Sequence, residues 1–443
     1  MTATQCHPRL LIVGTVPYNR QSTSRAFDAY FHGWEKENLA QIFSDPADPV
    51  KGHCGTLYQI TDRRMLSRWL DKKVNTGRRY DYADLVEEGS VDHRSETETD
   101  SGIVSHLRKL GQGHSPLFHL LRKALWRKRY WNTPEFNTWL EDFNPECVFL
   151  SFSNDFFILE IALYVAEKFD IPICSSTGDD YYFDDKFSLN PLWYLYHEWY
   201  KSLNRRVFRH KGSAIYIGDK IRDKYNSAFG LDGETVYLVS DIKRRDFRPI
   251  DSENFTVRYF GNIEYGRNNS LCDVATAFGL INPRIRVEVY SGESNPQIIA
   301  PLQSHPNIDF RGRIPYQEVM DKTIDSDILL VVEGTTKSDI NSTRYALSTK
   351  VADSLASGCN IVGYGSIECG AIEYIEKIGC VVMGHNVDTM EQALRELLNR
   401  TDLQRSNYDK AAQIFEQNHT REQSNARVER IIRRLVAKNQ THA

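Results

Sequence analysis

The sequence predicts an α/β protein built from two doubly wound domains, each a parallel sheet with helices on both of its faces. Apolar strand-like runs alternate with helical runs along both halves of the chain. The alternation stops over residues 241–255, where charged residues and prolines replace the apolar pattern. A chain of 443 residues is also too long for one ordinary hydrophobic core. Two large domains are therefore expected.

The first domain should begin with a buried strand within residues 9–20, which breaks at Gly14, and a helix over residues 22–37. An irregular polar stretch follows and culminates in residues 87–102, where the acidic composition predicts a mobile surface loop.

Clearer alternation follows, with a strand at 145–155, a helix at 156–169 and a strand at 171–177 that ends in the acidic loop 178–185. The last predicted elements of this domain are the strand 213–218, a helix that ends at Gly230 and the strand 234–240. We place the boundary after residue 245, so that the first domain covers 1–245.

The second domain, residues 246–418, repeats the alternation. After a first strand in "TVRYFG", further strands are expected at 284–292, 308–314, 327–334, 360–365 and 380–384. Helices fill the gaps, and residues 419–443 form a basic amphipathic helix that should cross back to the first domain. Two such domains should face each other across a cleft, with ligands beyond the carboxyl ends of the strands.

Composition narrows the class of protein. The formal net charge is −4, so a nucleic acid is not an expected partner. The eight cysteines include no Cys-x-x-Cys pair and fit free thiols in a reducing compartment better than disulfides or a zinc site. We find neither a signal peptide nor an apolar run near the roughly 20 residues of a membrane span. A cytoplasmic protein is expected.

The segment "STKVADSLASGCNIVGYG", residues 348–365, predicts a helix that ends at Gly358 before a strand. Ser348 or Thr349 could cap the start of this helix, where free N–H groups favour an anion. Lys350 and Asp353 share the face away from the apolar side. The same spacing also fits a solvated amphipathic helix.

This segment and two others, "YFGNIEYGRNNSLCDVATAF" and "IDFRGRIPYQEVMDKTIDSDILLVVE", resemble retaining glycosyltransferases of the two-Rossmann-domain (GT-B) fold, glycosyltransferase family 4 and its relatives. A weaker match, "FRHKGSAIYIGDKIRDKYNSAFG", resembles the closing unit of that family's N-terminal domain. Together the matches cover roughly residues 205–415 of this sequence.

The resemblance implies a set of residues for a nucleotide-sugar donor. Two glutamates of the family fall on Tyr345 and Asp353, so one acid is lost and the other shortened. The donor-binding set is Asn262, Arg267, Ile314, Ser348, Thr349, Lys350 and Asp353. Arg267 and Lys350 would pair with the diphosphate, and Asp353 would accept hydrogen bonds from the ribose.

The implied reaction moves a sugar, with retention, to a glycan, lipid-linked or small-molecule acceptor, as in polysaccharide biosynthesis. Fixed cations and helix N-termini stabilise a departing diphosphate without a metal. Since no compact His/Asp/Glu cluster is visible, no metal or cofactor is expected.

The acidic loop supplies a candidate base on the acceptor side. Among Asp179, Asp180, Asp184 and Asp185, we select Asp179 as the group that could orient an acceptor hydroxyl. Plain solvation of a charged loop is the alternative. His7, His32 and His385 could each contact substrate or be structural.

Residues 120–131, "LLRKALWRKRYW", combine five cations with Leu, Trp and Tyr. They suggest contact with an anionic membrane surface or with a lipid-diphosphate acceptor. A solvated basic helix face fits equally well.

Two other functions remain open. A nucleotide-sugar 2-epimerase would share the two-domain plan and act on UDP-N-acetylglucosamine without an acceptor. A non-catalytic nucleotide-sugar-binding subunit would explain the missing acid at Tyr345.

Overall fold

A computed structural model of the chain describes residues 6–14, 16, 25–86, 116–153, 155–183 and 188–442. The expected loop 87–102 and the candidate acids Asp184 and Asp185 lie outside these ranges. The chain divides into two compact units. The first comprises Met1–Tyr216, Lys224–Glu234 and Asn425–Ala443, and the second comprises Ile217–Asp223 and Thr235–Ser424.

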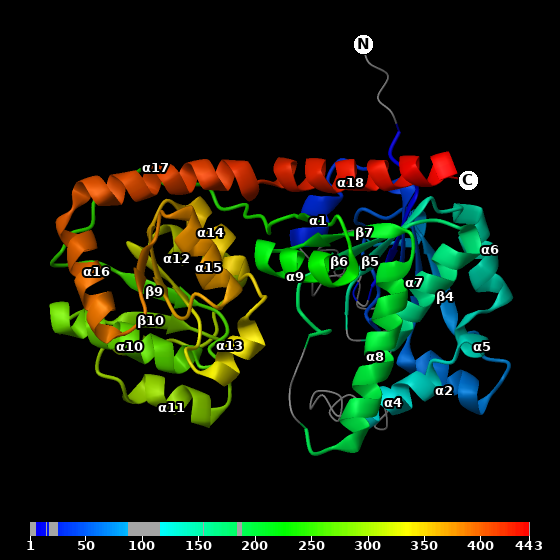
Figure 1. Cartoon of the computed structure of the whole chain (residues 1–443), viewed down its shortest axis with the longest axis horizontal. Coiled ribbons are helices and arrows are strands. Elements are labelled where there is room, and N and C mark those ends of the chain that lie inside the picture. The colour runs from blue at the N-terminus through cyan, green and yellow to red at the C-terminus, as the bar shows by residue number, and fades with distance from the viewer. Residues whose placement is uncertain are drawn as a thin grey trace, which may run out of the picture. The chain divides into compact units, whose positions relative to one another are not determined.

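The first unit is built on an eight-stranded sheet with the order β4-β3-β2-β1-β5-β6-β7-β8. Figure 1 labels β4, β5, β6 and β7 of this sheet. The strands from β1 to β7 run parallel to their neighbours except β4, which pairs antiparallel with β3. Their bounds are β1 Leu10–Val13, β2 Leu39–Phe43, β3 Thr56–Ile60, β4 Gly77–Asp81, β5 Cys147–Ser151, β6 Ile173–Thr177, β7 Gly212–Tyr216 and β8 Glu234–Thr235. The α-helices are α1 Arg25–Tyr30, α2 Asp62–Leu70, α4 Pro116–Leu125, α5 Lys128–Trp131, α6 Pro134–Phe143, α7 Phe156–Phe169, α8 Pro191–Arg209 and α9 Asp219–Phe229.

The polar stretch after residue 37 was expected to be irregular, and that expectation is wrong. It contains β2, β3, α2 and β4. The apolar pattern is interrupted because Gln41 and Gln59 occupy buried strand positions. Each has a local partner: the Nε2 of Gln41 donates to Val16 O at 3.0 Å, and that of Gln59 donates to Asp45 O at 2.9 Å.

The expected strand 234–240 is much shorter in the structure. Only Glu234 and Thr235 form β8, although Val236 and Val239 are also buried. The segment leaves the sheet because its backbone finds another partner: the N–H of Ser240 donates to His419 O at 3.2 Å.

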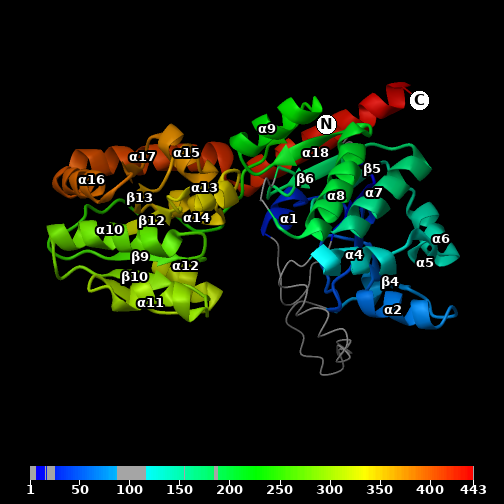
Figure 2. The same ribbon diagram turned by 60° about the horizontal axis from the view of Figure 1, so that its bottom comes forward.

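The second unit has a six-stranded sheet with the order β11-β10-β9-β12-β13-β14. All of its strands run parallel, as the sequence predicted, and Figure 2 labels β13, β12, β9 and β10. Its strands are β9 Val257–Phe260, β10 Val287–Tyr290, β11 Ile308–Phe310, β12 Ile328–Val332, β13 Asn360–Tyr364 and β14 Val382–Gly384. Its helices are α10 Arg267–Ile281, α11 Pro296–Ser304, α12 Tyr316–Ile324, α13 Lys337–Thr343, α14 Thr349–Ser357, α15 Gly370–Ile378, α16 Val387–Asn399 and α17 Thr401–Asn418.

Apolar side chains cover both faces of this second sheet. One buried cluster joins the strands to α10 and α16, through residues such as Leu271 and Leu394. Another joins them to α14 and α15, through residues such as Leu355 and Ile375. Helices therefore pack on both faces, which confirms the doubly wound architecture.

The order of the second sheet creates a switch point between β9 and β12, where successive connections turn to opposite sides. These two strands pair over two positions, Ile328↔Val257 and Leu329↔Arg258. Beyond them the ladder does not join the carboxyl ends of β9 and β12, and a switch point of this kind is where ligands bind in such folds.

The basic tail forms α18, Arg421–His442, and returns to the first unit, as expected. The Nδ2 of Asn425 donates to Tyr30 O at 3.0 Å, and Arg430 pairs with Glu234 at 2.7 Å. Val428 and Ile431 on this helix are fully buried. Within the described ranges, no helix has both the length and the apolar content of a membrane span.

Candidate functional site

Several residues predicted to bind a donor gather at the switch point of the second unit. Arg267 is the first residue of α10 and follows the loop 261–266 that leaves β9. Glu333 is the first residue after β12, and Thr349 begins α14. Because parallel strands end at one edge of their sheet, these connections meet there.

Arg267 is held by Glu333, an acid that sequence reasoning did not select. Its Nη2 and Nε lie 2.7 and 3.0 Å from Glu333 Oε2. Both side chains are nearly enclosed, with 12% and 3% of their surface exposed. The backbone of Glu333 is fixed as well, since its N–H donates to Tyr364 O at 3.0 Å and its carbonyl accepts the Ser270 hydroxyl at 2.8 Å.

Burial raises the pKa of Glu333 above the ordinary value of a glutamate. The positive charges of Arg267 and Lys350 act in the opposite direction, and so does a hydrogen bond with Thr343, but burial is the larger effect. Ionisation of Glu333 at this position therefore costs more free energy than ionisation of an exposed glutamate.

Lys350 connects the start of α14 to the end of β9. Its Nζ donates to the hydroxyl of Tyr259 at 3.1 Å and lies 4.7 Å from the centre of that ring. The lysine passes against Gly261, where a Cβ would lie 2.0 Å from Lys350 Cε. Gly261 also has a φ of +127°, which side chains rarely adopt. A glycine is thus required at position 261, where the Lys350 side chain lies against the backbone.

A second acid packs against the same loop. The carboxylate of Asp339 lies so close to Gly266, whose φ is +74°, that any Cβ there would collide with it. Asp339 accepts a hydrogen bond from the hydroxyl of Thr336, the residue that caps α13. The side-chain partner of Asp339 is thus a hydroxyl rather than one of the two cations.

The charge balance of this cluster is uneven. Over the described part of the chain, Glu333 is the one carboxylate within ion-pairing distance of Arg267, and Lys350 bonds a phenol rather than an acid. Two cations thus accompany one buried carboxylate beside the N-terminus of α10. Such a cluster can hold an anion with two or more negative oxygens.

The other residues predicted to bind the donor also follow the carboxyl ends of strands in the second sheet, but their exposure and contacts differ. Asn262 is exposed, and its amide group bonds Glu264. Ser348 caps α14 by accepting the N–H of Lys350 at 3.4 Å, and Thr349 is exposed. Ile314 follows β11, which β10 separates from β9, so it lies farther along the edge.

Asp353 lies one turn after Lys350 on α14. Its Oδ1 accepts a hydrogen bond from the hydroxyl of Ser240, with 2.6 Å between the two oxygens. Ser240 is itself buried. Asp353 is therefore anchored to the segment that precedes β9. Tyr345 lies in the connection before α14 and is half-buried.

Asp179 belongs to the first unit, in the loop after β6. It is exposed, and the hydroxyl of Tyr181 donates to its Oδ2 at 3.4 Å. Although part of its surface is exposed, the surrounding protein partly desolvates the carboxyl and raises the pKa of Asp179. The hydrogen bond from Tyr181 opposes this shift, and the charge of Asp180 adds to it. Asp180 has a structural role, because its Oδ1 accepts the Tyr225 hydroxyl at 2.7 Å and an N–H of the loop, that of Tyr182, at 3.0 Å.

The three candidate histidines lie at different places in the structure and have different contacts. His7 stacks on Trp34 in the first unit, and its Nδ1 bonds Glu35. His32 accepts, through its carbonyl, the side chain of Asn425 at 2.8 Å. In the second unit, the Nδ1 of His385 bonds Gly365 O at 2.9 Å, directly after β13.

Metal-ligating side chains do not gather in the part of the chain that the structure describes: no three His, Cys, Asp or Glu residues there are placed to share an ion. The eight cysteines are unpaired, and six of them are buried.

No protein-family model matches the chain, and no curated protein matches it by sequence. Solved structures do match. HepE of Anabaena in complex with UDP is 12% identical, with a TM-score of 0.57 over 96% of this chain and 99% of that one. Sucrose-phosphate synthase of Thermosynechococcus elongatus is 11% identical, with a TM-score of 0.56 over 98% and 100%.

WaaG, a glycosyltransferase involved in lipopolysaccharide biosynthesis, is 11% identical, with a TM-score of 0.52 over 95% of this chain and 99% of that one. These similarities extend over both units and show that the chain has the GT-B fold. At such identities they establish the fold alone.

Proposed function

We propose that the chain is a glycosyltransferase that moves a sugar from a nucleotide-sugar donor to a glycan, lipid-linked or small-molecule acceptor. One observation carries this proposal: Arg267 pairs with the buried Glu333 at the switch point of the second sheet, and Lys350, near enough to act on the same carboxylate, bonds a phenol. Doubly wound sheets bind nucleotides at that point. The excess of positive charge there suits a diphosphate.

The chemistry follows from the same cluster. When the bond from the sugar to the diphosphate breaks, negative charge grows on the leaving oxygen while the anomeric carbon becomes cation-like. Cations already held in place stabilise this charge without reorganising. Arg267 is fixed by Glu333, and Lys350 is fixed by Tyr259 and Gly261, so both are preorganised.

The remaining donor contacts are assigned by position. The N–H groups at the start of α14, at Ser348 and Thr349, would face the diphosphate, and Asn262 would flank it from the loop after β9. Ile314 would lie beside the base. Asp353 would accept a hydrogen bond from a ribose hydroxyl. Asp179 remains our candidate for orienting the acceptor.

The solved structures of the same fold guide the choice of donor. HepE has been determined with UDP and also with UDP-glucose. A uridine diphosphate hexose is therefore the first donor to test for this chain. Retention of configuration rests on the resemblance to glycosyltransferase family 4.

A thermal-unfolding screen of the full chain against nucleoside diphosphates and their sugars tests the proposal. A donor that binds the folded state alone raises the melting temperature by mass action. We expect UDP and UDP-glucose to stabilise the protein and uridine to have little effect. Absence of stabilisation by every nucleoside diphosphate would contradict the proposal.

A non-catalytic donor-binding subunit is the second candidate, because Tyr345 occupies a position where the resembling family has an acid. It predicts donor binding but no sugar transfer with any acceptor. A 2-epimerase would instead release or isomerise UDP-N-acetylglucosamine in the absence of acceptor. Nucleotide release, measured with and without acceptor, separates the three activities.

A further inference from the structure

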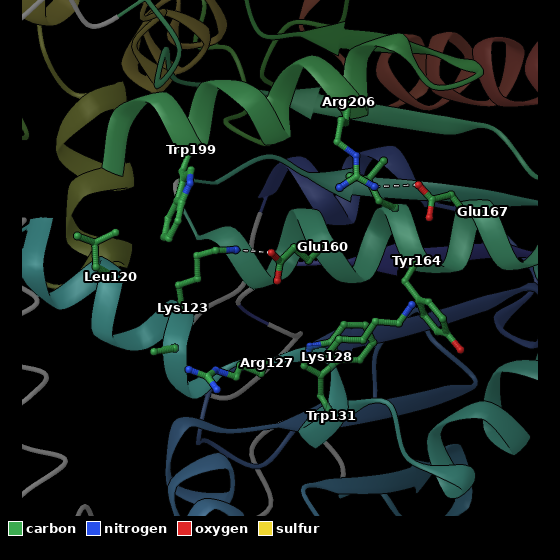
Figure 3. A pocket seen from close by; sticks show the side chains of 12 residues that line it. Leu120, Lys123, Arg127, Lys128, Trp131, Glu160, Tyr164, Glu167, Trp199 and Arg206 are labelled. Carbon is green, nitrogen blue, oxygen red and sulfur yellow. Dashed lines mark hydrogen bonds and ion pairs between the residues drawn. The ribbon is translucent and has the colours of Figure 1, made fainter. Parts of the chain in front are cut away.

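The first unit contains a groove that the proposed donor site does not use. It lies among α4, α5, α7 and α8 and has a volume of about 460 Å³ (Figure 3). Apolar side chains form much of its lining, namely Leu120, Ala124, Trp131, Leu163 and Trp199. The groove is therefore suited to an apolar group, and its charged residues determine which kind.

The acids of the groove are already neutralised. Lys123 pairs with Glu160, and Arg206 pairs with Glu167 at 3.0 Å (Figure 3). The two other cations of the lining, Arg127 and Lys128, are exposed. Neither has a carboxylate partner among the residues that the structure describes, and the Nζ of Lys128 lies 4.2 Å from the ring centre of Tyr164. The groove thus has positive charge to offer.

Large apolar side chains are exposed on the two helices that border the groove. Leu117 and Leu121 on α4 expose 51% and 54% of their surface, and Leu195 and Trp199 on α8 expose 47% and 46%. Each pair is four residues apart and so shares one helix face. Lys123 lies over the ring of Trp199 at 5.5 Å, which joins the two helices. Such a gathering of exposed apolar groups marks an interaction surface.

The structure shows which aromatic residues near the groove are accessible for an interaction. Trp126 and Trp131, prominent in the basic segment 120–131, are 1% exposed and belong to the core. Trp126 stacks on Phe157. Trp199, which also lines the groove, is 46% exposed; it is distant in sequence and is brought to the segment by α8.

We propose that the groove, with its cations Arg127 and Lys128 and its apolar border, docks the protein on a bilayer that contains anionic phospholipid. The apolar border consists of Leu117, Leu121, Leu195 and Trp199. Lipid phosphates would meet Arg127 and Lys128. Trp199 would lie at the headgroup level, and the leucines would enter the acyl boundary. Since the whole chain has a formal charge of −4, this attraction is local.

The test is co-sedimentation of the full chain with vesicles of phosphatidylcholine, alone or mixed with phosphatidylglycerol. We expect binding to the mixed vesicles that weakens with salt. Removing both of these cations in Arg127→Ala/Lys128→Ala should lower the partition coefficient about 25-fold, at roughly fivefold per charge. The matched control Lys243→Ala/Lys438→Ala removes two exposed lysines outside the patch and should have no comparable effect.

Two further measurements separate the alternatives. Trp199→Ala and Leu121→Ser should weaken vesicle binding while thermal unfolding shows that both variants are folded. Soluble glycerol phosphate should not compete at concentrations that match the lipid phosphate. Full competition by glycerol phosphate would reveal a small-anion site and overturn the proposal, as would equal losses in the patch and control variants or no binding to either vesicle. None of these results depends on donor binding.

Discussion

Arg122 in the first unit and Arg267 in the second are similar groups with different surroundings. Both side chains are largely enclosed, at 19% and 12% exposed. Arg122 meets two carboxylates, with its Nε 3.0 Å from Asp62 and its Nη1 bonded to Asp155. Arg267 meets one carboxylate, and Lys350 lies nearby.

The difference concerns charge balance rather than burial. The acids around Arg122 exceed its own charge, so the group is complete and serves to join α4, α2 and the start of α7. The cluster at Arg267 has more cations than bonded acids. An arginine of the first kind stabilises the fold, and one of the second kind can accept an anionic ligand.

The largest effect is expected at the second cluster. Arg267→Ala or Lys350→Ala should weaken UDP binding by about 1.5–3 kcal/mol, or roughly 10- to 150-fold, because each removes a charge-assisted contact. Titration calorimetry measures this. Arg284→Ala, at a surface arginine of the same unit that is 79% exposed, is the control and should bind as the wild type does.

Arg122→Ala should lower the stability of the protein rather than its affinity for UDP. It leaves Asp62 and Asp155 without their cation, and we expect the free energy of unfolding to fall by about 2 kcal/mol, less than for a fully buried pair because Asp62 is partly exposed. Urea unfolding gives this value. UDP affinity should not change. A folded Arg122→Ala variant with normal stability and weakened UDP binding would remove the distinction between the two arginines.

Glu333→Gln tests the role of the acid that pairs with Arg267. The variant removes a negative charge that competes with the diphosphate for Arg267 and Lys350, so UDP should bind about fivefold more tightly. Weaker binding by this variant would mean that Glu333 matters chiefly by orienting Arg267.

The same variant has a defined pH dependence. The pKa of Glu333 is raised in the folded protein, so its contribution to stability is complete below about 4.5, the ordinary value, and is lost as pH rises through the folded pKa. The wild type should therefore lose stability relative to Glu333→Gln as pH increases above 4.5. Urea unfolding at several pH values would show the opposite trend if the pKa were lowered instead.

The smallest effect is expected at Asp353. Asp353→Asn should weaken UDP binding about threefold, and Asp353→Ala somewhat more, because the charge-assisted bond to the ribose is lost. The matching 2′-deoxy nucleotide should show a smaller change. Ser240→Ala provides the control, since it removes the structural partner of Asp353 and leaves the carboxylate intact. Identical losses with both nucleotides would assign Asp353 to the fold alone.

Sequence patterns predicted the elements whose apolar runs are uninterrupted. The helix 156–169 has the predicted bounds in α7, and all six strands of the second sheet occur where expected. The strands β2 and β3 escaped prediction because buried glutamines interrupt their apolar pattern and are satisfied by partners outside the strand.

The site was less accessible to prediction because its charges come from separate connections. Arg267 and Lys350 were selected, but Glu333, the acid that pairs with Arg267, was not. Glu333 ends the apolar run "ILLVVE", and an acid there must lie at the sheet edge. The bond between Ser240 and Asp353 spans 113 positions, and spacing along the chain gives no signal for such a pair.

The central claim is that the excess positive charge at Arg267 and Lys350 binds the diphosphate of the donor. Comparing the affinities of UDP and uridine in the wild type and in Lys350→Ala tests it most directly, since the two ligands differ by the diphosphate alone. We expect the wild type to prefer UDP strongly and the variant to lose about tenfold or more of that preference, with uridine affinity unchanged. An undiminished preference for UDP in Lys350→Ala and in Arg267→Ala would contradict the account.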